Sequence, residues 1–571
     1  MFAKFEKAVR TGIESKTQRR FILLATLVGF ILSILMIAPT KMVLAKMLPG
    51  KDNDTFNIYV TLATGSSIAQ TAKVTSCVSS YVVQEKNVVD TEVFLGMGSP
   101  LDFAGLIKGS QFKNSENVAE IVLNITPKHH RDEPSYIMVQ RIRPIIQNAC
   151  EKLYPNTRIS FVEPPAGPPT MAAIVAEIYG DDAVGVRKLA LEVEKVFKNT
   201  EGLVDIDIMQ DQIYETFEIV VNSTKVARSG VDIEQLNNII YLAFEGMDIA
   251  VKNSEQYNEQ IPLFLSLSRE SKSFTTKDLN AIKAKLSSLK LMNKMGMMIP
   301  ITEIINITPK MSNPMILSKN LHQMTNVMAE TDMVSQVYPL MSARNVILDT
   351  FDKNYKIEKI GIFNLALTDK VSGKVYKLIW DGEMEVTLDT FVELGAAFIA
   401  ALILIFLLMV IYYKSYTLSG IILLGSFLSI IGVIVGHWIM DIFTADTFFL
   451  TATSLIGFIA LIGISSRNSL LLIDFTKSLM LDKGMHQAEA IAYSTATRAK
   501  PIFLTAVAIM LASTLLAGDA VFGGLGVSLI FGTVAAVIAS LIIVPVLLNM
   551  SDLESHFNFK EKNSVSINDP L

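Results

Sequence analysis

The chain has 571 residues, half of them hydrophobic, and a formal net charge of −5 at pH 7. It has neither a basic tract nor an acidic tail, so composition gives no indication of a nucleic-acid partner. With only two cysteines, Cys77 and Cys150, it is neither a disulfide-rich scaffold nor a zinc-cluster protein. The hydrophobic residues concentrate in long runs, which indicates an integral membrane protein with a large soluble part.

The chain begins with a polar, amphipathic segment, residues 1–20, that contains several lysines and arginines. The charge-free run Phe21–Pro39 follows and predicts a first membrane helix within residues 21–43. This run is longer than a signal-peptide core and has no small-residue cleavage site at its end, so we expect no cleavage. By the positive-inside rule the N-terminal segment is cytoplasmic, which places the region from about Lys46 to Leu388 outside.

The outer region is expected to be α/β. Its first part shows strand and helix patterns in the order βαββαβ, which is the split-βαβ arrangement of ferredoxin-like domains. The expected strands are 56–63, 91–96, 118–125 and 158–162, and the expected helices are 66–84 and 136–153. A proline-rich linker, residues 163–169, ends this unit, because consecutive prolines continue neither a helix nor a strand ladder.

A second α/β unit is expected after the linker. It begins with a strand at 172–179, a helix at 182–197 and a strand near 204–207. The pattern is interrupted after Val221, and residues 226–300 are expected to form an inserted module with a helix at 232–244. The second unit then resumes with residues 302–307, a helix around 345–353 and a last strand near 374–378.

Five further apolar runs lie within residues 390–550, and with the first run they predict six membrane helices and a cytoplasmic C-terminal tail, 551–571. The runs are 394–412, 418–438, 447–473, 502–516 and 524–548. Lysines and arginines lie in the loops expected inside, whereas the short outer loops, 437–446 and 518–523, have none.

One charge interrupts these runs. Arg467, followed by the polar Asn468, lies inside the apolar stretch Leu455–Asp474. An arginine inside a membrane helix costs about 2.5–3.5 kcal/mol on insertion scales, so an oppositely charged partner is expected. The alternative is an arginine that reaches the surface from a helix end, but the apolar run continues beyond it to Ile473. Arg467 is therefore a candidate functional residue.

Several segments resemble the resistance-nodulation-division (RND) transporters. Residues 463–475 (GISSRNSLLLIDF) resemble the motif of that family's tenth helix, and residues 498–505 (RAKPIFLT) resemble the start of its eleventh. Residues 380–383 (WDGE) and residues 174–180 after the proline-rich linker also match. One helix, a large outer domain and five helices together resemble the C-terminal half of such a transporter, as a split permease subunit.

The resemblance implies an α-helical bundle of six spans and a large α/β periplasmic domain of ferredoxin-like porter subdomains with an inserted docking subdomain. The first porter subdomain would cover 46–165, the second 166–225 and 301–388, and the docking subdomain 226–300. It further implies a proton antiporter rather than an enzyme, which exports hydrophobic compounds or metal ions without a cofactor. The implied location is the bacterial inner membrane, and the implied partners are lipids, a periplasmic adaptor, an outer-membrane channel and further copies in a trimer.

The resemblance also implies a proton relay of Arg467, Asn468, Thr505 and Arg498. A lysine is usual in the family where this chain has Arg467; guanidinium stays charged, which keeps a pairing role and disfavours deprotonation. The family's aspartate pair lies in the N-terminal half, and this chain has no mid-membrane carboxylate. A separate N-terminal-half RND subunit that carries the aspartate pair is therefore the expected partner.

Each relay residue also has a structural interpretation. Asn468 suits helix packing, Thr505 can bond a carbonyl of its own helix, and Arg498 can anchor its helix at the lipid headgroups. Asp474, near the end of its run, is interpreted as a cytoplasmic boundary residue rather than a proton carrier.

No metal site is expected. Thioethers suit Cu(I), but the methionines at 292, 295, 297 and 298 are interpreted as packing residues. The neighbouring histidines at 129 and 130 are interpreted as solvated loop residues. For Cys77 and Cys150, on two helices of the first unit, a disulfide and two packed thiols are both open.

Three other functions remain as alternatives: an ion-gradient-driven protein-export accessory subunit of the same superfamily, a non-transporting membrane receptor or assembly factor, and a truncated gene without a working product. The inserted module argues against the first, and an arginine in the membrane argues against the second. The sequence contains no GxxxxGK[ST] loop, GxSxG elbow or HExxH helix, which excludes an ATP-driven pump subunit and these hydrolase sites.

Overall fold

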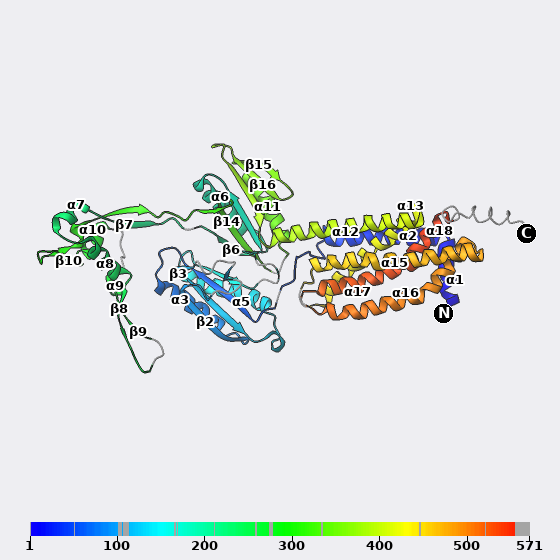
Figure 1. Ribbon diagram of the computed structural model, residues 1–571, viewed down its shortest axis with the longest axis horizontal. Coiled ribbons are helices and arrows are strands. Elements are labelled where there is room, and N and C mark those ends of the chain that lie inside the picture. The colour runs from blue at the N-terminus through cyan, green and yellow to red at the C-terminus, as the bar shows by residue number, and fades with distance from the viewer. Residues whose placement is uncertain are drawn as a thin grey trace, which may run out of the picture. The chain divides into compact units, whose positions relative to one another are not determined.

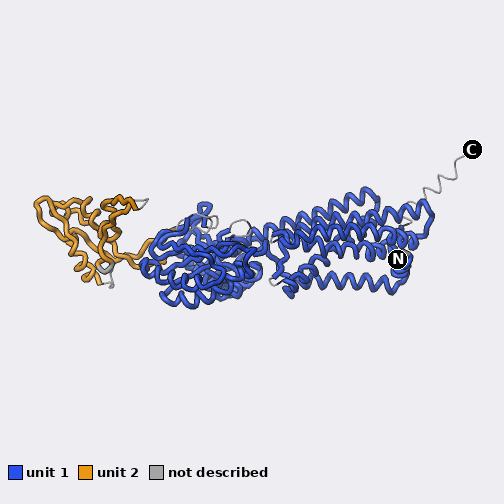
Figure 2. Tube along the Cα trace, turned by 90° about the horizontal axis from the view of Figure 1, so that it is seen from below, with its two compact units in different colours: residues 1–210, 316–571 blue, residues 211–315 orange. Residues whose placement is uncertain are grey.

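The computed structural model describes residues 2–50, 52–100, 105–106, 113–164, 167, 170–210, 212–256, 260–272, 278–332, 335–444, 447–519 and 521–553. The chain divides into two compact units (Figures 1 and 2). The larger unit contains Met1–Gln210 and Ile316–Leu571, and the smaller unit contains Asp211–Met315. Most of the expected C-terminal tail, from residue 554 onward, lies outside the described residues.

In the larger unit, residues 55–162 form a first α/β layer that contains all six elements expected from the sequence, in the expected order. These are β1 (Thr55–Thr61), α3 (Ile68–Val82), β2 (Val88–Met97), β3 (Asn114–Ile125), α5 (Ser135–Cys150) and β4 (Arg158–Val162). The strands are antiparallel in the order β2-β3-β1-β4. Their apolar positions pack against the two helices in one core that contains Phe56, Ile121, Val74 and Ile142.

The two cysteines form a disulfide, which resolves the alternatives that the sequence left open. Cys77 lies on α3 and Cys150 ends α5, and their Cα atoms are 5.9 Å apart. The bond joins the two helices of the first α/β layer across a sequence separation of 73 residues.

Removing this disulfide is expected to destabilise the first α/β layer. The Cys77→Ala/Cys150→Ala variant should lose about 2–4 kcal/mol of stability, because the unfolded chain is no longer restricted. Thermal unfolding in detergent, with and without reductant, measures the effect. Reductant should lower the unfolding temperature of the unaltered chain and leave that of the variant unchanged; equal unfolding of the unaltered chain in both conditions would contradict the prediction.

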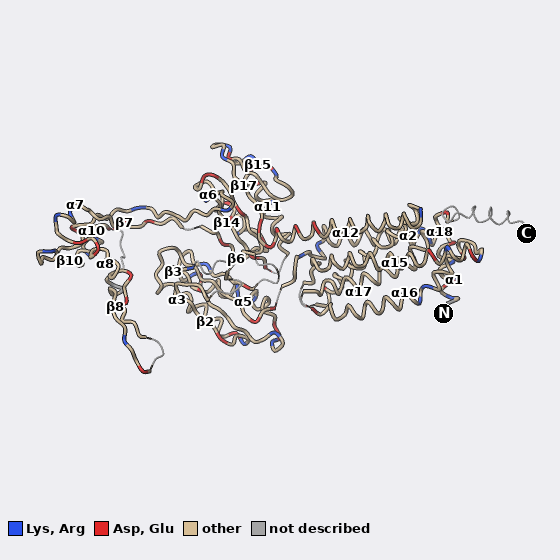
Figure 3. Tube along the Cα trace, in the orientation of Figure 1, with Lys and Arg blue, Asp and Glu red and all other residues tan. Residues whose placement is uncertain are grey.

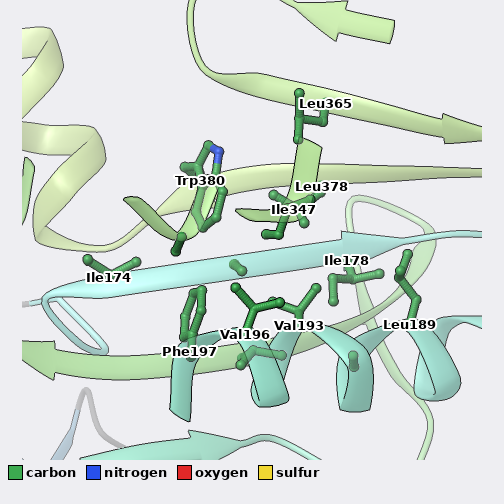
Figure 4. Packing of buried hydrophobic residues seen from close by; sticks show 14 of the residues in the cluster. Ile174, Ile178, Leu189, Val193, Val196, Phe197, Ile347, Leu365, Leu378 and Trp380 are labelled. Atoms are coloured by element: carbon green, nitrogen blue, oxygen red, sulfur yellow. The ribbon is translucent and has the colours of Figure 1, made fainter. Parts of the chain in front are cut away.

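A second α/β layer in the larger unit surrounds a seven-stranded sheet. Its elements are β5 (Ile174–Tyr179), α6 (Ala183–Lys198), β6 (Leu203–Ile208), β13 (Leu317–Lys319), β14 (His322–Thr331), α11 (Val337–Phe351), β15 (Tyr355–Ile360), β16 (Asn364–Asp369) and β17 (Val375–Asp381). The strand order is β13-β14-β5-β17-β16-β15, and β6 also pairs with β14. Figure 4 shows Val193 and Phe197 of α6 pointing toward β5, with Trp380 and Leu378 of β17 close by.

The structure differs from the sequence-based expectation at the return to this layer. Residues 302–307 do not resume the second unit, because β12 (Ile305–Met311) pairs with β7 (Glu215–Val221) inside the smaller unit. The return strand is β14, which the sequence pattern missed. Both faces of β14 are buried, and polar Thr325 and Asn326 lie among its buried residues, so the alternation that marks a strand is lost.

A buried ion pair links the two α/β layers. Arg143 of α5 donates from Nε to Asp205 of β6 at 3.1 Å and from Nη1 to Asp332 at 3.2 Å. Asp205 also accepts from Gln147 at 3.0 Å and from the backbone N–H of Phe161 at 3.1 Å. The Asp205 side chain is 1% exposed and that of Arg143 is 9% exposed, so neither charge is solvated by bulk water.

The smaller unit has its own core. Between β7 and β12 it contains α7 (Ser223–Ser229), α8 (Ile233–Phe244), β8 (Met247–Lys252), β9 (Ile261–Leu265), α9 (Arg269–Lys272), α10 (Leu279–Leu286), β10 (Lys290–Met292) and β11 (Met298–Pro300). Leu236, Ile282 and Ile301 lie in the core, and the helix expected at 232–244 is present as α8.

Six helical segments are long and apolar enough to cross a membrane, and they correspond to the six expected runs. They are α2 (Lys16–Ile37), α12 (Glu383–Tyr413), α13–α14 (Tyr416–Phe427 and Ser429–Phe443), α15 (Ala452–Lys483), α16 (Gln487–Ala517) and α17–α18 (Gly523–Ile538 and Val544–Met550). The amphipathic α1 (Phe2–Glu14) precedes them. Charged residues lie mainly near the ends of these helices (Figure 3).

One expected loop is largely helical. Residues 437–446 were assigned to an outer loop, but α14 continues to Phe443, and His437 is fully buried. The His437 ring is satisfied on both sides, with Nδ1 2.8 Å from the Val433 carbonyl oxygen and Nε2 2.9 Å from Ser454 Oγ. Because both ring nitrogens have partners, the imidazole can lie between helices without an unsatisfied polar group.

Candidate functional site

Helix α15 presents one exposed stripe along its length. The stripe is formed by Ile456, Ala460, Gly463, Arg467 and Leu471, which are all exposed. Their spacings of three and four residues place them on one helix face. Arg467 is near the middle of this 32-residue helix, about 22–24 Å from each end at 1.5 Å per residue. The charge therefore lies far from both ends of the helix.

Arg467 has no counter-charge within the part of the chain that the structure describes. No carboxylate there lies within ion-pair distance of its guanidinium, and no side chain there forms a hydrogen bond with it. The sequence predicted that a partner anion must be found for this residue. The described residues do not provide one, so the site as it stands is a cation on an open helix face.

Asn468 does not lie on the same face as Arg467. Asn468 is 6% exposed, and the nearby Ser465 and Ser469 are fully buried. Adjacent helical residues point in different directions, so Arg467 points outward while Asn468 lies among the packed helices. The structure thus separates two residues that the sequence motif presents as a pair.

The neighbouring helix α16 brings Thr505 to the depth of Arg467. The two helices are joined by a short turn at Gly484, and the Arg498 guanidinium of α16 lies 5.1 Å from the centre of the Phe475 ring of α15. Moving about seven residues along each helix away from that contact leads to Thr505 on α16 and Arg467 on α15. Both residues are exposed.

Neither Thr505 nor Arg498 forms a hydrogen bond with another helix within the described part of the chain. Thr505 Oγ1 is 2.9 Å from the Ile502 carbonyl oxygen and 3.1 Å from that of Pro501, so it bonds its own helix. Arg498 stacks on Phe475 in a cation–π contact. Its Nε is buried and has no hydrogen-bond partner among the described residues.

Asp474 is held by two tyrosines of α12 that the sequence analysis did not identify. It accepts from Tyr413 Oη at 2.8 Å and from Tyr412 Oη at 3.3 Å. About 10 Å of helix separate Asp474 from Arg467, so the two do not pair. Two consecutive tyrosines at the end of an apolar run were the available signal, since tyrosines concentrate at membrane interfaces.

Tyr413→Phe is expected to destabilise the chain more than Tyr412→Phe. Tyr413 is 7% exposed and makes the shorter bond to the carboxylate, whereas Tyr412 is 62% exposed. Loss of a hydrogen bond to a charged group costs about 1.5–3 kcal/mol when the site is buried. Unfolding temperatures of the two variants in the same detergent test this, and an equal or larger loss for Tyr412→Phe would contradict it.

The two outer segments that matched the family motif meet at the start of α12. Glu177 of β5 and Asp381 at the end of β17 both accept from Lys319 Nζ, at 2.6 and 3.0 Å. Tyr179 donates to Glu177 at 2.7 Å. Burial raises the pKa of Glu177, and the hydrogen bond from Lys319 opposes that shift. This cluster fixes the point where the second α/β layer continues into the first helix of the five-helix segment.

Residues 1–551 match the family model described as the AcrB/AcrD/AcrF family. Among curated proteins, the chain is 23% identical over 377 residues to the swarming motility protein SwrC of Bacillus subtilis strain 168, covering 65% of this chain and 32% of that protein. It is 27% identical over 149 residues to the multidrug export protein AcrF of Escherichia coli K12, covering 25% of this chain and 14% of that protein.

Two solved structures, both described as a heavy metal efflux pump, resemble the chain with TM-scores of 0.70. One is 19% identical and covers 95% of this chain and 52% of that chain; the other is 17% identical, with 96% and 51%. At this identity the likeness shows the fold. The chain spans about half the length of these structures and about a third or less of the curated relatives above.

Proposed function

The chain belongs to the AcrB/AcrD/AcrF family of RND permeases, and we propose that it works as one half of a proton-driven efflux transporter. The observation that carries the proposal is Arg467, a fixed positive charge in the middle of α15 on an exposed stripe. An arginine that faces lipid without a counter-charge is energetically costly. The presence of Arg467 is therefore best explained by a partner protein that covers the stripe.

The partner proposed for this stripe is an N-terminal-half RND subunit that carries a pair of aspartates at the depth of Arg467. The guanidinium stabilises the ionised carboxylates and lowers their pKa. A proton that arrives on the carboxylates removes their negative charge and with it the attraction to Arg467. The helices can then change position, and release of the proton to the other side restores the pair.

The other relay residues have distinct proposed roles. Thr505, at the depth of Arg467 and exposed, can turn its hydroxyl from its own carbonyls to a carboxylate on the partner. Arg498, about seven residues nearer the α15–α16 turn, is proposed to take part in proton entry. Asn468 supports the packing that holds α15 in this orientation.

The outer layers are proposed to be two ferredoxin-like porter subdomains. The first is residues 46–165, and the second is those parts of 166–225 and 301–388 that lie in the larger unit, because β7 and β12 belong to the smaller unit. The strand order β2-β3-β1-β4 in the first layer supports this assignment. The inserted residues 226–300, within the smaller unit, are proposed to dock toward an outer-membrane channel. The proposed assembly is a trimer in the bacterial inner membrane with a periplasmic adaptor, with both termini of this chain in the cytoplasm and its large domain in the periplasm.

The proposed substrates are hydrophobic compounds or metal ions. Both classes are supported only by the relatives, one described as a multidrug export protein and two as a heavy metal efflux pump. We propose secondary transport rather than an enzymatic reaction, because the sequence contains no phosphate-binding loop of the GxxxxGK[ST] type.

Export driven by a proton gradient is tested in cells that express this chain together with the partner proteins identified by co-purification. A panel of hydrophobic dyes, bile salts and metal ions identifies what the cells extrude. A protonophore added while cellular ATP is held constant should stop that export. Export that continues at the same rate after the proton gradient has collapsed would contradict the proposed energy source.

A further inference from the structure

Four methionines in the β10–β11 hairpin of the smaller unit are exposed. Met292, Met295, Met297 and Met298 are 62%, 83%, 54% and 57% exposed, respectively. The interpretation of these residues as packing residues is therefore wrong within this chain. Four long apolar side chains within seven residues all face solvent, and none of them lies in the core of the smaller unit. Their thioether sulfurs are accessible.

The hairpin places two of these side chains opposite each other on one face. Met292 of β10 pairs with Met298 of β11 in the antiparallel ladder. Side chains directly opposite each other have Cβ atoms about 4.5–5.5 Å apart. The adjacent pair, Leu291 and Ile299, points to the other face and packs on the core. The two methionines therefore share the outward face, where their sulfurs can approach one ion.

The tip that carries the other two methionines is fixed by Asn293. Its side-chain oxygen accepts from the backbone N–H groups of Met295 at 3.0 Å and Met297 at 2.9 Å. Its amide donates to the Ser229 carbonyl at 3.0 Å, which ties the tip to the end of α7. Gly296 completes the turn with φ of +80°, which a residue with a side chain rarely adopts. The backbone thus holds the four thioethers within one small region.

We propose that this hairpin is a surface binding site for a soft monovalent cation, Cu(I) or Ag(I), with Met292 and Met298 as its two principal ligands. Thioethers are soft, neutral donors that suit Cu(I), and Met295 and Met297 can complete the set. Harder divalent ions are disfavoured, because the hairpin sequence offers no carboxylate. Among the described residues, no group of three or more His, Cys, Asp and Glu could hold such an ion instead.

This site differs from the proposed relay in position and chemistry, and it does not depend on transport. Its test is binding of Cu(I) by the purified full chain in detergent, without oxygen, in competition with a chromogenic Cu(I) chelator. The unaltered chain should retain Cu(I) against the chelator, and X-ray absorption should show sulfur ligands at about 2.3 Å, a typical metal–sulfur distance.

Met292→Leu/Met298→Leu should weaken Cu(I) binding by at least about tenfold. Substitution of residues that only hold the ligands in place already causes a loss of this size at metal sites. The matched control is Met311→Leu/Met315→Leu, which replaces two other methionines of the smaller unit that are 55% and 53% exposed. Leucine keeps the apolar volume, so both variants should fold and keep any apolar contact with a partner protein. Binding by the control should equal that of the unaltered chain.

Two outcomes would overturn the proposal. One is an unaltered chain that retains no Cu(I) against the chelator. The other is equal loss, or no loss, in the hairpin variant and the control, which would assign the binding to methionines elsewhere. If the double hairpin variant does not fold, the single variants Met292→Leu and Met298→Leu take its place, and affinities equal to that of the control would also overturn the site.

Discussion

Arg467→Ala is expected to abolish proton-driven export and to leave the chain folded and inserted in the membrane. Arg467 is exposed and has no ion pair or hydrogen bond within the described part of the chain, so its replacement breaks no such bond there. Removing the charge leaves the proposed aspartate pair without its counter-charge, and its protonation no longer changes an attraction. Export by cells with equal membrane amounts of the two chains measures the effect.

The matched control is Lys500→Ala, which removes an exposed positive charge on α16 outside the proposed relay. Its export should equal that of the unaltered chain. Arg467→Lys should keep part of the activity, because the charge remains. Complete inactivity of Arg467→Lys would indicate that the carboxylates require the bidentate hydrogen bonding of a guanidinium. Normal export by Arg467→Ala would contradict the proposed role of Arg467 in a proton relay.

Arg143→Ala is expected to give the largest loss of stability, about 3–5 kcal/mol, because it leaves a buried carboxylate without its partner. Asp205 is 1% exposed on its side chain, and burial already raises its pKa, while the charge of Arg143 opposes that shift. Without Arg143 the carboxylate must be buried unpaired or take up a proton. The unfolding temperature in detergent should fall accordingly.

Two further variants separate the buried pair from ordinary surface pairs. Lys356→Ala breaks the exposed pair with Glu358 in the second α/β layer and should leave the unfolding temperature unchanged. Arg143→Met/Asp205→Leu replaces both charges by apolar groups and should be less destabilised than Arg143→Ala. If Arg143→Ala unfolded at the same temperature as Lys356→Ala, the buried pair would not hold the two layers together.

Much of the fold could be predicted from the sequence, because its pattern is strong where one face of each element is buried. The six elements of the first α/β layer and the six apolar helices follow directly from alternation and run length. The prediction failed at β14, where both faces are buried and Thr325 and Asn326 remove the alternation. It also failed for most of the outer loop expected at 437–446, where α14 continues to Phe443.

The candidate site was harder to predict, because sequence spacing does not say what lies against a helix face. The position of Arg467 within α15 could be predicted, but the burial of Asn468 beside it and the bond from Tyr413 to Asp474 come only from packing. The methionines of the β10–β11 hairpin show the same limit. They were expected to pack, and only the structure shows that their face of the hairpin is uncovered within this chain.

The most direct test of the central claim is to identify what covers the α15 stripe in the native membrane. A photo-reactive residue introduced at Leu471, one turn from Arg467, would be crosslinked before gentle detergent purification, with Ile403 on the exposed face of α12 as the control position. We expect crosslinking at Leu471 to membrane helices that carry an aspartate pair, recovered in equal ratio with this chain, whether on a second chain or on a further part of the same polypeptide. Crosslinks to lipid alone at both positions would contradict the account and would make Asp474 the leading candidate for the proton carrier.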